Sequence, residues 1–550
     1  MPSCIYSQVL TRVIRSWATL SPITLLRPTL LRVGLALAVL LALGWPVAAQ
    51  LPPSQPDPLA RMREAAATTQ QACTTDDSSA CAAAAPKIIS SALGASPLAD
   101  NLRRLTDEIG GRIAGSPTMT RAVGWGVAGF REAGVDEVHT EKFTIPVTWS
   151  EGNSRLEVIA GASFGVHLVS VGWSPATPAG GIEANVVDVA IGDEADFARA
   201  GEATRGAILL VHTNVMHTLD GLWEEQQRDP GVISRAAAAG ASAILWMSNR
   251  EAMLLYRDVH GTDGSLEKLP QAIVAREDAE RLARDLAAGQ KLRVRLELPN
   301  RIGGPAEQEN VVAEIRGREK PDEFVVLGAH LDSWDLGTGA LDSGCNAALV
   351  IEAARDIHLT GLRPRRSIRF VLFGGSEQGL LGSHAYVLAH HAELDHAIAA
   401  ILFNKGSGRV TGFSLGGRRD IEPGVRESLD PLSSWGIGKN TDDTFLGTDN
   451  FDFLLEGVPN LVANQEEANY AANYHASSDT YDKVDLVNVK LNTAIAGLLA
   501  FSIAEHSAPL GRRLSRAEVD ALLKQTGLEA QMKTAGLWRS WEGGQRGRQQ

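Results

Sequence analysis

"VVLGAHLDSWDLGTGALDSG", residues 325–344, passes from a continuous apolar run into a segment rich in Asp and Gly. The apolar run has the length and composition of a strand that is buried on both faces. Similar runs recur, and we predict helices between them beginning near Ser343, Glu377 and His391. The recurring runs are "NVVAEIRG" (310–317), "EFVVLGAH" (323–330), "SIRFVLFGG" (367–375) and "AIAAILFN" (397–404). This alternation predicts an α/β fold with a mixed, largely parallel sheet and helices on both faces.

Polar side chains follow these strands, where an open α/β sheet binds its ligands. Imidazoles and carboxylates at one sheet edge suit a divalent metal, above all zinc. The alternative is that the two histidines of this set are capping or core groups. The set consists of His330, Asp332, Asp342, Glu377, Asn404 and, within "NYHASSDTYDKVD" (473–485), His475 with Asp479 behind it.

Residues 161–300 have a different character from their surroundings. Short apolar strands such as "GAILLVHTN" (206–214) alternate with Ala-rich helical pieces, and His212, His217 and His260 are scattered without ligand-like spacing. We predict a smaller accessory α/β domain, inserted between two parts of the main domain at 96–160 and 301–507.

The two ends of the chain are predicted to lie outside the main domain. Residues 1–49 have a basic start, the apolar run Val33–Trp45 and small residues before Gln50. These features predict a signal peptide and an exported, periplasmic or secreted protein, with an uncleaved anchor as the alternative. Residues 50–95 are predicted to form a linker and a helix, and 508–550 a helix at 515–533 followed by a mobile tail.

Charge and cysteine content restrict the partners. The chain of 550 residues has a net charge of −13, which argues against binding to nucleic acid or, once the signal is cleaved, to an anionic membrane. Oligomeric contacts through the accessory segment or the helix at 515–533 remain open. Cys73 and Cys81 are candidates for a disulfide in an oxidising compartment, with two unpaired thiols as the alternative. Cys345 is expected to be a small buried thiol.

Three separated motifs resemble the co-catalytic di-zinc exopeptidases of the carboxypeptidase Q (plasma glutamate carboxypeptidase) type. They are "GAHLDSWDLGTGALD" (328–342), "SEQGLLGS" (376–383) and "YHASSDTYDKVD" (474–485), and "GGRIAGSP" (110–117) looks like the opening of that family. The segment at 161–300 is similar to a protease-associated domain. The resemblance covers about residues 97–507 and implies a metallopeptidase fold, zinc, and dipeptides or short peptides as substrates.

The resemblance also implies roles for individual residues. His330 matches the histidine of one zinc, and Asp332 matches the aspartate that supports this histidine. Asp342 matches the carboxylate that bridges the two zincs. Glu377 and His475 match ligands of the other zinc. Two zincs polarise a carbonyl and activate a shared water, whose proton passes to a nearby carboxylate.

The chain departs from the family pattern at three places. Ser376 stands where the family has its general-base acid, and Asn404 stands where the family has an aspartate ligand. Ser343, Gly344 and Cys345 follow Asp342, where another aspartate and a glycine pair are usual. Loss of a general base typically costs about 10² to 10⁴ in rate.

These departures predict one firmly held zinc at Asp342, Glu377 and His475, with the His330 side weak or empty because Asn404 brings no charge. Ser376 is expected to be the N-cap of the helix that follows. Two functions remain open. One is a zinc exopeptidase or dipeptidase with impaired activity, and the alternative is a catalytically disabled member that binds peptides or a protein partner.

Overall fold

The computed structural model describes residues 78–161 and 163–549. The predicted signal peptide lies outside these residues. Cys73 lies outside them as well, and the prediction of a Cys73–Cys81 bridge therefore falls there too.

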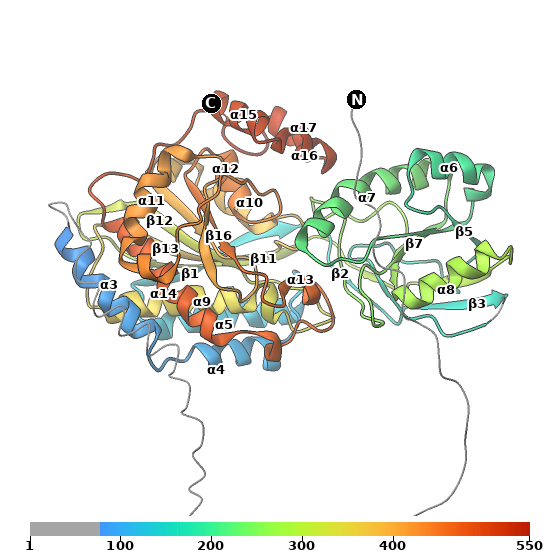
Figure 1. The fold of residues 1–550 in the computed structure, drawn as a ribbon, viewed down its shortest axis with the longest axis horizontal. Helices are drawn as coiled ribbons and strands as arrows, with labels where there is room; N and C mark the ends of the chain where they lie inside the picture. Colours follow the sequence, from blue (N-terminus) through green and yellow to red (C-terminus); the bar gives the residue numbers. More distant parts are fainter. Residues whose placement is uncertain (1–77, 162, 550) are drawn as a thin grey trace, which may run out of the picture. The chain divides into compact units, whose positions relative to one another are not determined.

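The main domain is built on a seven-stranded sheet with the order β1-β11-β13-β12-β14-β16-β15 (Figure 1). The central pairs β13–β12, β12–β14 and β14–β16 are parallel, and the outer pairs are antiparallel. This arrangement confirms the predicted mixed α/β fold. The strands are β1 (Glu137–Ile145), β11 (Ala306–Ile315), β12 (Lys320–His330), β13 (Arg366–Phe373), β14 (Ala397–Leu402), β15 (Val410–Ser414) and β16 (Asn460–Gln465).

Helices cover both faces of this sheet. One face packs on the large core cluster, and the other on a smaller cluster that includes residues of α10 and α12. The first face carries α3 (Ser78–Ala92), α4 (Leu98–Arg103), α5 (Pro117–Ala133), α9 (Cys345–Leu359), α11 (Glu422–Leu429) and α14 (Leu486–Glu505). The second carries α10 (Leu381–Ala389) and α12 (Asn450–Leu455), and the short α13 (Tyr470–Asn473) follows β16.

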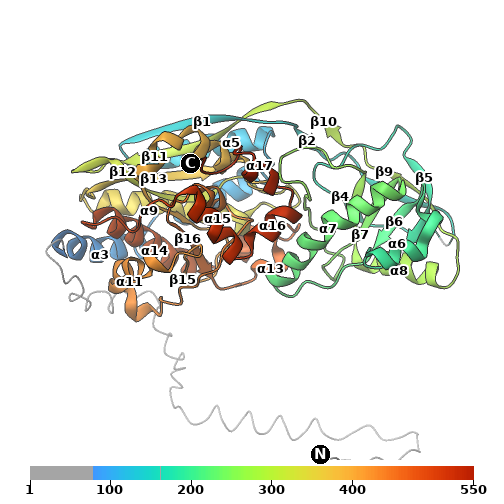
Figure 2. The same ribbon diagram turned by 90° about the horizontal axis from the view of Figure 1, so that it is seen from above.

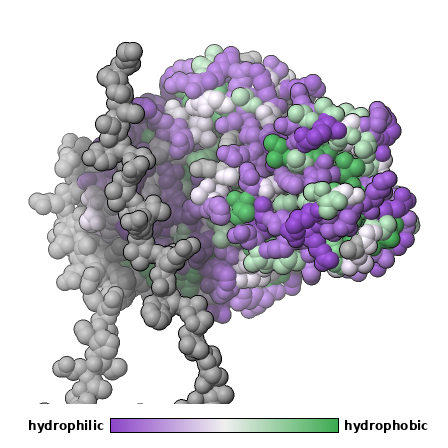
Figure 3. All heavy atoms as spheres, turned by 45° about the vertical axis from the view of Figure 1, so that its right-hand side comes forward, coloured by the Kyte–Doolittle hydropathy of each residue, from purple (hydrophilic) through white to green (hydrophobic). Residues whose placement is uncertain are grey.

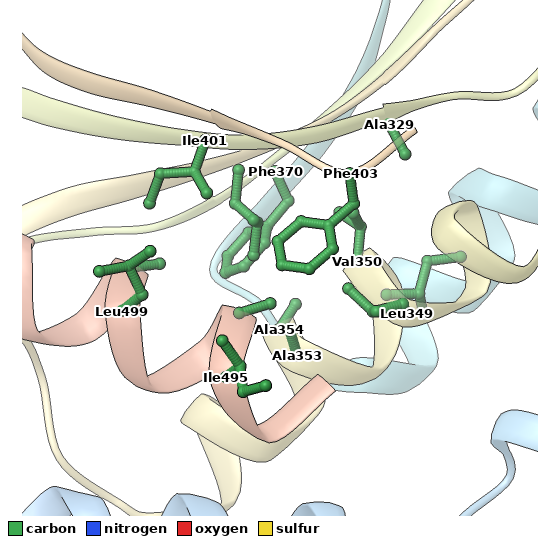
Figure 4. Packing of buried hydrophobic residues seen from close by; sticks show 14 of the residues in the cluster. Ala329, Leu349, Val350, Ala353, Ala354, Phe370, Ile401, Phe403, Ile495 and Leu499 are labelled. Atoms are coloured by element: carbon green, nitrogen blue, oxygen red, sulfur yellow. The ribbon is translucent and has the colours of Figure 1, made fainter. Parts of the chain in front are cut away.

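The main core lies between the sheet and the helices α9 and α14. Phe370 and Phe403 point from the sheet toward Val350 and Ala354 of α9 and Ile495 of α14 (Figure 4). Among the described residues, α14 is the one helix long and apolar enough to cross a membrane, but 78% of its most apolar window is buried inside the fold. Its apolar surface is thus taken up by the sheet, α9 and α3.

The helix α5 shows how local sequence signals set the ends of an element. Ser116 at the N-cap accepts a hydrogen bond from the backbone N–H of Met119, and Pro117 occupies the first turn. Gly134 ends the helix in the left-handed region with φ 84. A Cβ at Gly134 would lie 2.7 Å from Nε2 of His358, so that side chain would also have to shift.

A buried carboxylate in α9 should make stability depend on pH. Burial raises the pKa of Asp356 to about 8, while the hydroxyl of Ser91 donates to it. Between about pH 4 and 8 the folded state holds a proton that the unfolded state has released, so stability falls as pH rises. We expect Asp356→Asn to gain about 1–3 kcal/mol over the wild type at pH 8 and little at pH 4. Melting temperatures at both pH values test this, and an equal shift at both would contradict it.

A second seven-stranded sheet is formed wholly by residues 155–297 (Figure 2). Its order is β3-β9-β5-β6-β7-β8-β4, and the strand β3 begins at Arg155, earlier than the predicted boundary after residue 160. The strands are β3 (Arg155–Ala160), β4 (Leu168–Ser170), β5 (Ile182–Asp188), β6 (Ile208–Val211), β7 (Ala243–Met247), β8 (Gln271–Val274) and β9 (Arg293–Glu297). The helices are α6 (Glu194–Ala200), α7 (Leu219–Ala239) and α8 (Arg276–Ala287).

Two connections join this segment to the main domain. The strands β2 (Trp149–Ser150) and β10 (Arg301–Ile302) pair antiparallel as a two-stranded ribbon. The chain therefore enters and leaves the second sheet through adjacent strands.

The C-terminal region is more ordered than predicted. The helix expected at 515–533 is two helices, α15 (Arg516–Gln525) and α16 (Leu528–Thr534), because Gly527 between them is left-handed with φ 76. The expected tail contains α17 (Trp538–Glu542), with Trp541 only 2% exposed. Arg546 binds both carboxylate oxygens of buried Asp452 at 2.7 and 2.9 Å. This region packs on the main domain as far as Arg548, whose backbone N–H donates to the carbonyl oxygen of Leu455 at 3.0 Å.

The face visible in Figure 3 is mostly hydrophilic. Its hydrophobic residues lie in several small groups and do not form one broad patch. This distribution is the ordinary one for a globular surface.

Candidate metal centre

Three loops at one edge of the main sheet bring Asp342, Glu377 and His475 together. Asp342 follows β12, Glu377 follows β13, and His475 follows β16 and α13. One ligand atom of each residue lies within 4.8 Å of the others. Nε2 of His475 is 3.2 Å from Oδ2 of Asp342 and 3.1 Å from Oε2 of Glu377. These three residues are the set that the sequence predicts for the firm zinc site.

The donor set fits a tetrahedral zinc ion. Zinc bonds of about 2.0–2.2 Å at tetrahedral angles separate two ligand atoms by about 3.3–3.6 Å, close to the distances found here. Oδ2 of Asp342, Oε1 of Glu377 and both ring nitrogens of His475 are buried without a hydrogen-bond partner. Buried polar atoms are rarely left in this state, and a cation satisfies all three residues at once. The backbone of His475 is also left-handed, with φ 59, which is uncommon outside glycine.

The charges of the cluster are strongly coupled. Burial raises the pKa of Glu377 to about 7. Burial alone would lower the pKa of His475, but the charge of Glu377 and the contact with Asp342 raise it to about 10. Burial also opposes the charge of Asp342, but His330 and His475 outweigh it and hold its pKa below the usual range. A divalent cation would take the place of the histidine proton, so binding should release protons.

The His330 side of Asp342 is arranged differently. Nδ1 of His330 lies 3.0 Å from the backbone oxygen of Asp332, and because a carbonyl only accepts, Nδ1 carries the proton. Nε2 then faces Oδ1 of Asp342 at 3.4 Å. The hydroxyl of Tyr470 donates to the same Oδ1 at 2.9 Å and lies 3.3 Å from the carbonyl oxygen of Asn404. A neutral hydroxyl therefore stands where a second cation would meet Asp342.

Asn404 and Cys345 lie close to the metal group. The backbone oxygen of Asn404 is 3.3 Å from the hydroxyl of Tyr470, and Asn404 also lines a neighbouring cavity with Tyr470 and Tyr474. Cys345 is fully buried, and burial raises the pKa of its thiol above the usual range. The expected role of Cys345 as a small buried thiol agrees with this position.

Carboxylates behind the cluster hold its backbone. Both oxygens of Asp332 accept backbone N–H groups, from Ser376 at 3.1 Å and Glu377 at 3.0 Å. Asp479 accepts the N–H of Asp342 at 3.1 Å and that of Leu341 at 2.7 Å. Asp332 thus positions Glu377 as well as His330, and Asp479 positions Asp342 and not the ring of His475.

A buried arginine fixes the loop between these ligands. Arg112 is fully buried and donates to the carbonyl oxygens of Leu331, Thr338 and Gly339 at 2.7–3.0 Å. The loop after β12 is thereby tied to residues that precede the second sheet in the chain. Arg112 lies within the motif GGRIAGSP, but the motif alone does not indicate this contact.

The prediction that Ser376 caps a helix is wrong. Gly379 and Leu380 are left-handed with φ 120 and 62, so the helix cannot extend back to Ser376 and α10 begins at Leu381. The hydroxyl of Ser376 instead donates to the carboxylate of Asp449, at 2.8 Å to Oδ1 and 2.9 Å to Oδ2. No motif in the sequence points to Asp449 as this partner.

A cleft beside the cluster is lined from both sheets. The main domain contributes Ser376, Glu377 and His475, and the second sheet region contributes Glu225 of α7 and Asp258. Burial raises the pKa of Glu225 to about 7. Among the described residues that line this cleft, none is a lysine or an arginine. His260 also lines the cleft, 3.5 Å from Asp229, so the cleft offers a bound molecule carboxylates, one imidazole and the metal group.

Comparison with known proteins places this geometry in a family. The model of Peptidase family M28 matches residues 310–499, and this range holds all five predicted metal ligands, which are His330, Asp342, Glu377, Asn404 and His475. Carboxypeptidase Q of Mus musculus is 30% identical over 421 residues, which cover 75% of this chain and 87% of that protein.

Solved structures agree with this comparison. A peptidase M28 precursor from Shewanella amazonensis matches with a TM-score of 0.72 and 27% identity, covering 80% of this chain and all of that chain. BSAP, a zinc aminopeptidase from Bacillus subtilis, matches with a TM-score of 0.60 and 19% identity over 76% of this chain and 97% of that chain, a likeness of fold alone. On the identity and coverage shared with carboxypeptidase Q, the chain belongs to peptidase family M28.

Proposed function

We propose that the chain is a zinc-dependent exopeptidase or dipeptidase that hydrolyses short peptides. The observation that carries this proposal is the group of buried, unpartnered ligand atoms of Asp342, Glu377 and His475 at the cleft. Zinc, when bound, polarises the peptide carbonyl and lowers the pKa of a water molecule. The name of the mouse relative, carboxypeptidase Q, supports the substrate class.

The protein's own residues prepare the site. Asp332 and Asp479 fix the backbones of Glu377 and Asp342, so the ligands need little rearrangement on binding. Glu377 and His475 are buried, so water is excluded from their side of the substrate's peptide carbonyl. Electrostatic interactions with that carbonyl are stronger as a result.

We also propose that one zinc is held firmly and that the His330 side is weak. Tyr470 donates to the oxygen of Asp342 that a second zinc would need, and its pKa is raised well above the usual range by burial, so it stays a neutral donor. Tyr470→Phe frees that oxygen, and a hydrogen bond to a charged group is worth about 1.5–3 kcal/mol. We expect the second zinc to bind about 10- to 100-fold more tightly in the variant.

Zinc titration and metal analysis of the two proteins measure this effect. Tyr386→Phe is the matched control, because Tyr386 is also buried but packs in the second core cluster away from the ligands. Two zincs per chain in the wild type purified without added metal would contradict the proposal.

The composition of the cleft favours the amino end of a substrate. Glu225, Asp229 and Asp258 line it, and the basic His260 is already 3.5 Å from Asp229, so acidic groups remain in excess and an ammonium group is better accommodated than a free carboxylate. We propose that the substrate's amino end lies against this wall.

Hydrolysis of a dipeptide panel by the mature protein with added zinc tests these proposals, beside N-acetylated and C-amidated versions of the best substrate. We expect turnover well above that of zinc-free protein, loss on acetylation and tolerance of amidation. Peptide binding without turnover would instead favour a catalytically disabled binding protein. Loss on amidation with tolerance of acetylation would reverse the proposed orientation.

We also propose that the protein is exported and that it carries an accessory domain. The basic and apolar pattern of residues 1–49 supports a cleaved signal peptide. The separate sheet at 155–297 supports a protease-associated-like domain whose α7 helps to line the cleft.

A further inference from the structure

Asp449 is a buried carboxylate near the cleft, and it takes no part in the proposed metal site. It is 2% exposed and lies immediately before α12, at the N-cap position. Both of its oxygens lie within 2.9 Å of Oγ of Ser376, and Ser376 borders the cleft beside Glu377 and His475. The serine hydroxyl thus joins the cleft to a carboxylate that the cleft does not reach directly.

Burying this carboxylate is costly. Burial raises the pKa of Asp449 to about 6, although the charge of His330 and the hydroxyl of Ser376 act in the opposite direction. The hydroxyl groups of Ser376 and Ser383 only partly replace the water that a carboxylate loses on burial. Asp449 is therefore poised to accept a proton, which would remove its unfavourable buried charge.

Asp449 is not placed as a metal ligand. The described residues contain one group of three or more side chains close enough to hold an ion, and it consists of Asp342, Glu377 and His475. The carboxylate is also turned to Ser376. By the resemblance seen in the sequence, Ser376 stands where the di-zinc exopeptidases have their general-base acid. The position of the missing base is thus connected to an acid that comes from a different part of the chain.

We propose that Ser376 and Asp449 together replace the missing general base, with Ser376 relaying a proton to Asp449. As a water molecule attacks the peptide carbonyl, its O–H bond breaks and the proton goes to Oγ of Ser376. In the same step the Ser376 O–H bond breaks, and that proton goes to Asp449. The reverse transfer delivers one proton to the leaving amine and restores both residues. This inference rests on the proposed peptidase function.

The test compares Ser376→Ala, Ser376→Thr and Asp449→Asn with the wild type on the best dipeptide, with zinc content measured for each. Ser376→Ala and Asp449→Asn are each expected to lower kcat by about 10² to 10⁴ with zinc content and KM unchanged. Asparagine can still accept the serine hydrogen bond but cannot take the proton. Ser376→Thr keeps the hydroxyl and should retain most of kcat.

The double variant Ser376→Ala with Asp449→Asn separates a relay from two unrelated effects. Members of one relay act as a unit, so the double variant should lose no more kcat than either single variant. Asp356→Asn removes a buried carboxylate elsewhere and should leave kcat unchanged. Multiplied losses in the double variant, or normal kcat in Asp449→Asn, would overturn the relay while leaving the peptidase function standing. A zinc-loaded wild type without turnover would refute the function itself, and the relay with it.

Discussion

Replacing Asp342 by alanine is expected to remove the bound zinc and to lower peptide hydrolysis by about 10³-fold or more. Asp342 contacts both histidines of the cluster, His475 through Oδ2 and His330 through Oδ1. Its loss would leave Glu377 and His475 as the only members of the described three-residue group, too few for a firm zinc site. Metal analysis and turnover of the same preparation measure both effects.

Asp356→Asn is the matched control for this loss. Asp356 is as buried as Asp342 but lies on α9 away from the cleft, so its replacement should change neither zinc content nor turnover. Full zinc content in Asp342→Ala would show that the metal is bound by other residues.

A glutamate at position 376 should rescue the loss caused by Asp449→Asn. The double variant Ser376→Glu with Asp449→Asn places a carboxylate directly at the cleft and removes the one behind it. We expect its kcat to exceed that of Asp449→Asn by about 10² to 10⁴, the usual value of a general base. Steady-state hydrolysis of the same dipeptide by the two proteins gives this ratio.

Two further variants sharpen the comparison. Ser376→Gln with Asp449→Asn has the shape of the rescuing variant without its charge and should remain as slow as Asp449→Asn. Ser376→Glu alone would set two carboxylates side by side, since Oγ of Ser376 is within 2.9 Å of both oxygens of Asp449, and should melt at a lower temperature. Equal rates for the glutamate and glutamine versions would show that no base is needed at this position.

The sheet could be predicted from local patterns, and the three central ligands from the resemblance to the di-zinc exopeptidases. Continuous apolar runs mark buried strands, and the ends of parallel strands meet at one edge. Asp342 and Glu377 follow neighbouring parallel strands, whereas His475 reaches the same edge only through α13 and the left-handed backbone after it.

The partners of these ligands could not be predicted, because they depend on how distant segments pack. Tyr470 and Asp449 lie in the long region between β15 and α14 and carry no motif of their own. The helix start at Ser376 was mispredicted because Leu380, an ordinary residue by sequence, adopts a left-handed backbone. Glu225 reaches the cleft from α7, and no local pattern relates that helix to the strand ends.

The paired strands β2 and β10 have a consequence for how such enzymes diversify. Ser150 pairs with Arg301 and Trp149 with Ile302, so the intervening polypeptide departs and returns at one point. A domain inserted in this way leaves the strand order of the main sheet unchanged and can vary as one unit. Evolution can therefore change one wall of the cleft by altering or exchanging the segment between β2 and β10, while the main sheet keeps its strand order.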